Sequence, residues 1–225
     1  MFKKVHCHGS TFTCGSNLDD QNHQNFAYLM HEKLGIPCIN QGFNRSSNED
    51  TFLRASVSLL DADADVIFVE WCGPGNQRYY PNHLSVQTME THEYDTLYNQ
   101  YYKLSQFLPL LDSMAFKMNK TVFHFTSDLF IDEEFLKIPL PPLNNEDISH
   151  IGGFSRWALQ VNPSKPDITA ERASLNSIRT LLLTIRSTDW LNLGSSIKDT
   201  WSDLSLVDQH KQVADMCLTK IAEKA

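Results

Sequence analysis

Two glycines enclose three hydroxyl side chains in the segment Gly9–Gly15, which directly follows the first expected strand. A hydroxyl in such a turn can attack a carbonyl carbon when a neighbouring base takes its proton. Thr11 and Ser10 are the candidate nucleophiles of this segment. The chemistry that these residues predict is acyl transfer, which becomes hydrolysis when water accepts the acyl group.

This segment resembles the first motif of the SGNH/GDSL hydrolase family, Gly-Asp-Ser-x-Thr-x-Gly, whose Ser attacks an ester carbonyl. Gly9, Thr13 and Gly15 match the motif. Thr11 stands at the position of the Ser, and Ser10 at that of the Asp. An internal threonine is an uncommon nucleophile, because its branched Cβ is stiff and nucleophilic threonines mostly lie at chain N-termini. Ser10 could replace it only through a one-residue slip, which would break the rest of the match.

Two later loops resemble the blocks with which the family stabilises an oxyanion. Gly42, in the polar segment 40–48, matches the Gly whose backbone N–H faces the developing charge. It could alternatively serve only a turn. The family's third block is Gly-x-Asn-Asp, and segment 72–78 departs from it. Strict register puts a proline at the Asn position, whereas a shift of two residues makes Asn76 the second donor.

The family's general base is a His that follows an Asp just before the last helix. Asp203 matches that Asp, but a leucine or a serine stands where the His belongs. Asp147 and His150 have the Asp-x-x-His spacing and lie far from the last helix. His150 could supply the base if its segment folds back over the site, since imidazole suits proton transfer near neutral pH. The triad is therefore either degenerate or completed by a relocated base.

Short β-like runs alternate with helical runs along the chain. We expect strands at Lys3–His8, Ile36–Asn40, Asp65–Trp71 and Thr121–Thr126. We expect helices over Phe26–Leu34, ended by Gly35 and Pro37, over Asn48–Leu60, capped by Asn48 and carrying Phe52, Leu53, Val57 and Leu60, over Glu90–Met118 and over Val207–Ala222. This alternation predicts an α/β fold with a central parallel sheet between two helical layers. The resemblance implies the flavodoxin-like SGNH hydrolase form of this three-layer α/β/α sandwich, with ligands beyond the carboxyl ends of the strands.

The 225 residues, 41% of them hydrophobic, suffice for the core of one domain. We therefore expect a single SGNH-hydrolase-like domain over residues 1–225. The stretch at about 128–167 is too irregular and long for a simple connection. It predicts a lid over the site or a surface for a protein partner.

Composition excludes several classes of function. The net charge of −8 and the absence of a Lys/Arg block argue against nucleic acid as a partner. No apolar run reaches the roughly 20 residues of a membrane span. Five cysteines form no CxxC pair, which favours free thiols in the cytoplasm and gives no zinc-type spacing. We expect no metal and no cofactor.

The resemblance as a whole implies an ester hydrolase of a divergent bacterial or phage branch. Its substrate would be a small acyl or acetyl ester of a polar or carbohydrate molecule. The alternative is a catalytically inactive SGNH-like domain used for ligand binding or protein association. The two differ in one observable feature, because an active site must place an imidazole within hydrogen-bond reach of Thr11 or Ser10.

Overall fold

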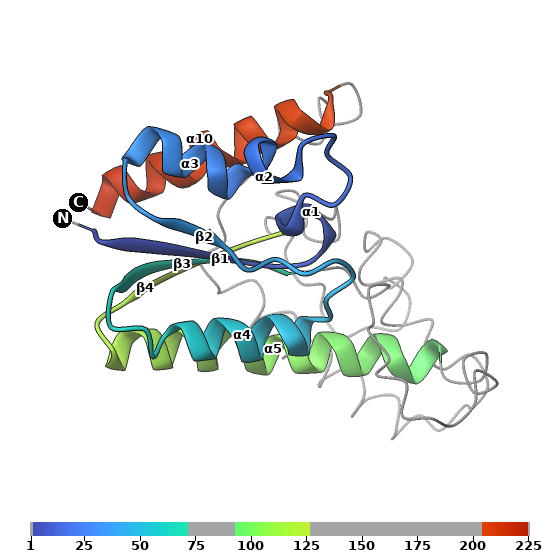
Figure 1. The fold of residues 1–225 in the computed structure, drawn as a ribbon. Coiled ribbons are helices and arrows are strands. Elements are labelled where there is room, and N and C mark those ends of the chain that lie inside the picture. Colours follow the sequence, from blue (N-terminus) through green and yellow to red (C-terminus); the bar gives the residue numbers. More distant parts are fainter. Residues whose placement is uncertain (1, 72–92, 127–203, 225) are drawn as a thin grey trace, which may run out of the picture.

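A four-stranded parallel sheet with the order β2-β1-β3-β4 is the centre of the fold (Figure 1). The computed structural model describes residues 2–71, 93–126 and 204–224. The strands are β1 (Lys4–His8), β2 (Cys38–Asn40), β3 (Ala64–Glu70) and β4 (Thr121–Phe125). Every strand lies where the sequence predicted one. Their order matches the first four places of the flavodoxin-like doubly wound sheet.

Helices cover both faces of this sheet (Figure 1). On one face lie α3 (Phe26–Leu34) and α10 (Leu206–Lys224), and on the other α4 (Asn48–Ser58) and α5 (Glu93–Lys117). Two short helices, α1 (Thr11–Cys14) and α2 (Gln21–Gln24), follow β1. The predicted three-layer α/β/α sandwich is therefore confirmed. Within the described segments, no helix combines the length and the apolar character needed to cross a membrane.

Strand β1 lies inside the sheet and sets its register. Val5 pairs with Cys38 of β2 and with Val66 of β3, and Val66 pairs with Thr121 of β4. Since all strands are parallel, their carboxyl ends lie at one edge of the sheet. The loops that follow β1, β2 and β3 therefore begin at that edge.

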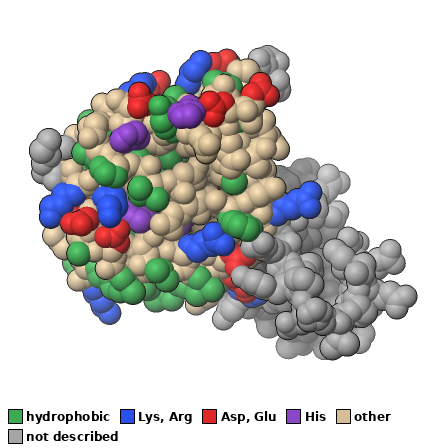
Figure 2. Space-filling view, in the orientation of Figure 1, with side chains coloured by type: hydrophobic (Ala, Val, Ile, Leu, Met, Phe, Trp, Pro, Cys, Tyr) green, Lys and Arg blue, Asp and Glu red, His purple; other side chains and the backbone are tan. Residues whose placement is uncertain are grey.

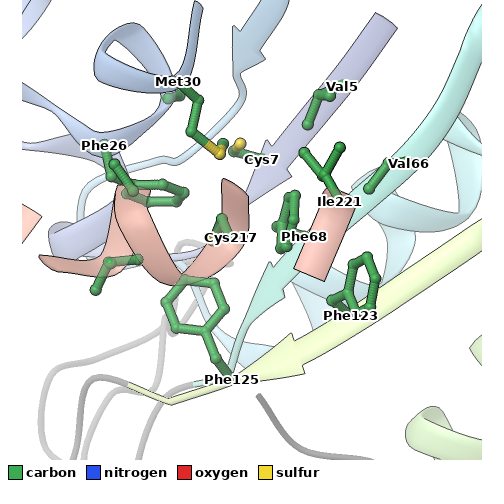
Figure 3. Packing of buried hydrophobic residues seen from close by; sticks show 13 residues of the cluster. Val5, Cys7, Phe26, Met30, Val66, Phe68, Phe123, Phe125, Cys217 and Ile221 are labelled. Atoms are coloured by element: carbon green, nitrogen blue, oxygen red, sulfur yellow. The ribbon is translucent and has the colours of Figure 1, made fainter. Parts of the chain in front are cut away.

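The side chains of β1 alternate between an apolar and a polar face. Val5 and Cys7 are buried in the main hydrophobic cluster with residues of α3 and α10 (Figure 3). His6 and His8 point to the opposite face, where their rings lie 6.1 Å apart and nearly parallel. Both imidazoles are buried and share one face of the strand. The helix that covers this face must consequently offer polar partners.

Helix α4 covers that face with small and polar side chains. Ala55 and Ser58 are buried, whereas Leu53, Val57 and, just beyond the helix, Leu60 are 60%, 66% and 70% exposed. Hydrophobic side chains accordingly gather at the edge of the molecule where α4 lies (Figure 2). Of the four apolar residues that the sequence places on this helix, only Phe52 is partly buried, and its ring stacks on Phe107 of α5. The reason lies in β1, because two imidazoles occupy the space in front of α4 and leave room only for small residues.

The ends of the helices follow local capping rules. Asn25 caps α3 through its side-chain oxygen, which accepts from the N–H of Tyr28 at 3.0 Å. Gly35 ends the helix with a φ of 67°, as the sequence predicted. Helix α4 corrects one prediction, since Ser47 rather than Asn48 is its cap. The Ser47 Oγ accepts from the N–H of Asp50 at 3.1 Å, and Asn48 is already the first helical residue.

A chain of hydrogen bonds joins the two imidazoles to α4. Asp61 Oδ2 lies 3.1 Å from His6 Nε2, and Ser58 Oγ lies 3.0 Å from both His6 Nδ1 and His8 Nε2. Burial, together with smaller effects of the nearby His6 and Arg54, lowers the pKa of His8 to about 3. Burial also lowers the pKa of His6, against the opposing effect of Asp61. Both imidazoles are therefore neutral in the folded protein near pH 7.

We expect the free energy of unfolding to fall as the pH drops below about 6.5. The unfolded chain then binds protons at His6 and His8 that the folded protein does not bind. For His8, whose pKa changes from 6.5 to about 3 on folding, the loss is about 2 kcal/mol at pH 5. Urea unfolding at a series of pH values should give a flatter pH dependence for His8→Phe than for the parent. His23→Gln, at an exposed histidine, is the control, and an equal slope in His8→Phe would contradict the prediction.

The exposed face of α4 leads to a second prediction. Leu53→Gln and Leu60→Gln should each change the free energy of unfolding by less than about 0.5 kcal/mol, as surface substitutions do. Ala55→Leu should cost about 1–3 kcal/mol, because it forces a larger side chain against the sheet. Chemical denaturation of the three variants measures this difference. A large loss in Leu53→Gln with a small one in Ala55→Leu would show that α4 packs through its apolar residues.

Candidate functional site

Thr11 is the first residue of α1, the one-turn helix at the carboxyl edge of the sheet. Its Oγ1 donates to Asn44 Oδ1 at 3.0 Å and accepts from the backbone N–H of Arg45 at 3.2 Å. The side chain is partly exposed. The loop after β2 therefore orients an accessible hydroxyl at the place where the sequence predicted a nucleophile.

Ser10 differs from Thr11 in exposure. The residue is 1% exposed, and its Oγ has no hydrogen-bond partner among the described residues. Its backbone N–H donates to the buried carboxylate of Glu70, the last residue of β3. Of the two candidate nucleophiles, Thr11 is the one that a substrate can reach in this conformation.

Gly42 lies against the same helix but uses its N–H differently from the prediction. The Gly42 N–H donates to Asn40 Oδ1 at 2.9 Å, and Asn40 Nδ2 donates to the carbonyl oxygen of Thr13 at 2.7 Å. A Cβ at Gly42 would lie 2.4 Å from the backbone nitrogen of Cys14. The glycine is thus required for the close approach of this loop to α1, and in this conformation its N–H does not face Thr11.

Three residues of this edge were not identified from the sequence: Asn44, Arg45 and Glu70. Arg45 adopts a φ of 60°, a left-handed conformation that is rare outside glycine and often marks functional loops. This conformation directs its N–H at Thr11 Oγ1. The sequence indicated only that the loop after β2 is polar. Local residue types predict neither a positive φ at an arginine nor a contact with a residue far away in the chain.

The remaining candidates lie outside the described residues. They are Asn76 as the second oxyanion donor, Asp203 as the orienting carboxylate and the pair Asp147 and His150 as the relocated base system. The expected lid or partner surface at 128–167 lies outside them as well.

The described imidazoles do not supply a base to Thr11 or Ser10, because none hydrogen-bonds with either hydroxyl. His210 lies in α10, the helix next to which the resemblance places the general base. Its ring stacks on Phe12 with 4.1 Å between centroids, and its Nδ1 accepts from the N–H of Phe26 at 3.1 Å. Burial lowers its pKa to about 4. His210 therefore fixes α1 and α3 against α10 and is a poor proton acceptor.

Asp61, His6 and Ser58 form a hydrogen-bonded series with the residue types of a catalytic triad. Ser58 is 4% exposed and lies on the side of α4 that faces the sheet. A substrate carbonyl cannot reach its hydroxyl without displacing the helix. This group therefore belongs to the packing of α4 on β1.

A cavity of about 270 Å³ borders α1 on the side of α2 and α3. Its lining includes Gln21, Asn22, Asn25, Tyr28, His31 and Asn40, and it extends to Cys14 and Gly42. No Lys, Arg, Asp or Glu of the described segments lines it. The cavity can therefore hold a small uncharged group through amide, phenol and imidazole hydrogen bonds. No cluster of three or more potential metal ligands occurs in the described part of the chain.

The close approach of Gly42 to α1 can be tested directly. Gly42→Ala should lower the free energy of unfolding by about 1–3 kcal/mol, because its Cβ meets backbone atoms that cannot move aside easily. Gly35→Ala, whose Cβ would meet no atom within 4 Å, should cost only the strain of a positive φ, about 1 kcal/mol. Chemical denaturation compares them, and an equal loss in both variants would contradict the contact.

No protein-family model and no curated protein sequence matches the chain. Among solved structures, it is similar to a member of the lipolytic protein G-D-S-L family from Veillonella parvula. The identity is 11% and the TM-score 0.44, over 96% of this chain and 97% of that one. It is also similar to a protein assigned to the lipolytic G-D-S-L family from Desulfitobacterium hafniense, with 13% identity, a TM-score of 0.29 and coverage of 71% and 99%. The parallel α/β/α fold of the chain itself rests on the sheet and the helices described above.

Proposed function

We propose that the chain is an SGNH-type hydrolase that cleaves small acyl esters, with Thr11 as its nucleophile. One observation carries this proposal. The accessible Oγ1 of Thr11 lies at the carboxyl edge of the sheet, with the backbone N–H of Arg45 3.2 Å away. Ester cleavage requires a nucleophilic oxygen, a donor for the oxyanion and a base, and this edge of the sheet supplies the nucleophile and one candidate donor.

The reaction would proceed in two steps. Thr11 Oγ1 attacks the ester carbonyl as the base takes its proton, and the carbonyl oxygen becomes an oxyanion. The N–H of Arg45, which donates to Thr11 Oγ1 in the resting conformation, turns to this oxyanion, with Asn76 as the expected second donor. The tetrahedral intermediate collapses, the alcohol leaves with the proton, and water then hydrolyses the acyl-threonine. In our proposal, Asp147 and His150 or Asp203 provide the base system.

The cavity beside α1 supports a polar substrate. It meets the nucleophile turn at Cys14 and the following loop at Gly42, and its described lining is uncharged. Such a lining suits the hydroxyl groups of a carbohydrate or a similar neutral molecule better than a phosphate or a carboxylate. We place the activity in the cytoplasm, because the four described cysteines are free thiols.

A second candidate function is ligand binding without catalysis. It is favoured by the hydrogen bond that Thr11 Oγ1 donates to Asn44 Oδ1, because a reacting hydroxyl must donate to its base instead. The N–H of Gly42 is likewise engaged by Asn40. In this alternative the cavity beside α1 is the ligand site, and the turn serves as its wall.

Covalent labelling separates the two functions. We expect a fluorophosphonate to form an adduct on Thr11, detected by intact mass and peptide mapping. Thr11→Val, which keeps the shape of the side chain but removes the hydroxyl, should abolish the adduct. Thr11→Ser should be labelled at least as fast as the parent, because serine can make both hydrogen bonds of Thr11 without the methyl group.

Two further variants locate the base and the alternative nucleophile. Loss of the adduct in His150→Ala would identify the relocated base, and Ser10→Ala should leave labelling unchanged. A folded parent protein that forms no adduct and hydrolyses no short-chain acyl ester would exclude the hydrolase and leave the binding function.

A further inference from the structure

We propose that Glu70 is the positioning residue of the candidate site, acting on Thr11 through the turn that carries it. Glu70 Oε2 accepts from the N–H of Ser10 at 3.1 Å, the N–H of Thr13 at 2.9 Å and the hydroxyl of Thr13 at 2.6 Å. An oxygen surrounded by three donors has no room for a proton of its own. Glu70 therefore holds the turn through three hydrogen bonds at one oxygen, and such bonds are about twice as strong when the acceptor is an ionised carboxylate.

This carboxylate replaces the usual cap of α1. Ser10 occupies the N-cap position but makes no side-chain cap hydrogen bond. A one-turn helix is not stable by itself, because helix nucleation fixes several residues for a single hydrogen bond. Glu70 accepts from two backbone N–H groups at this helix start, those of Thr13 and Ser10, which lie 57 and 60 positions earlier in the chain. The conformation of α1 is thus imposed by the end of β3.

Gly9 makes this contact possible. A Cβ at position 9 would lie 2.4 Å from Glu70 Oε2 and 2.2 Å from Thr13 Oγ1. Any side chain there would displace the carboxylate or the threonine hydroxyl. A tightly packed unit of Gly9, Glu70 and Thr13 therefore supports the turn that carries the candidate nucleophile.

The consequence for Thr11 follows from its place between the two fixed residues. Ser10 and Thr13 are both held by Glu70, so the start of α1 cannot rotate freely and Thr11 Oγ1 stays directed at the loop after β2. Glu70 is 1% exposed and cannot touch a substrate. It acts only through the orientation of Thr11, and its catalytic meaning rests on the proposed function.

Glu70→Gln tests this inference, because glutamine has the same shape but lacks the charge. We expect the rate of fluorophosphonate labelling at Thr11 to fall at least about tenfold, since small misplacements of a reacting group have such effects. Hydrogen exchange of the peptide over residues 9–15 should become faster. The control is Ile221→Ala, in the core at the far end of α10, which should lower stability but leave the labelling rate unchanged.

The outcomes separate this inference from the proposed function. If the parent is labelled and a folded Glu70→Gln variant is labelled at the same rate, the role of Glu70 is overturned. The proposed hydrolase function is then unaffected. A parent that is not labelled overturns the hydrolase itself. If Glu70→Gln does not fold, Thr13→Val and Thr13→Ser take its place. The valine variant should be labelled slowly and the serine variant at the parent rate, and equal rates for both would overturn the inference.

Discussion

The carboxylate of Glu70 joins the end of β3 to the turn after β1 and accepts two backbone N–H groups and one hydroxyl. A buried charge is tolerated only where hydrogen bonds replace the lost water, and here three donors do so. The contact needs a residue without a side chain at Gly9. Because this contact fixes α1, it also fixes the surface of α1 against which Gly42 and the loop after β2 pack. The buried contacts of Glu70 thus determine the geometry around Thr11.

A second constraint comes from the polar face of β1. His6 and His8 bring two imidazoles into the interior, and each requires a hydrogen-bond partner because an unpaired buried polar group is costly. Ser58 serves both. Helix α4 consequently turns its small residues inward and leaves an apolar row in contact with solvent, the reverse of the usual amphipathic helix. One strand therefore determines the polarity of the helix that covers it.

These two constraints explain which features the sequence could predict. The strands were found because β3 is a nearly continuous apolar run and β1 alternates, and α3 was found because Gly35 ends it. These signals are local. The orientation of α4 depends on β1, and its cap shifted by one residue because Ser47 and Asn48 are both good caps.

The site was predicted only in part for the same reason. Thr11 could be located because a motif of glycines and hydroxyls has fixed spacing. The contacts of Arg45 with Thr11 and of Glu70 with Thr13 join segments 34 and 57 positions apart. Residue types near each partner say nothing of such contacts, and the left-handed φ of Arg45 has no signature in composition.

The hydrogen bond from Thr11 to Asn44 does not by itself exclude catalysis. Releasing a hydroxyl from such a partner costs about 0.5–1.5 kcal/mol, because the new partner or water replaces most of the interaction. That is roughly a tenfold effect on a rate, small beside the acceleration of at least about 10⁶ that enzymes typically provide. The absence of a base would weigh more, since general base catalysis contributes about 10²–10⁴. The proton acceptor that meets Thr11 therefore decides between hydrolysis and binding, and the hydrogen bond to Asn44 matters much less.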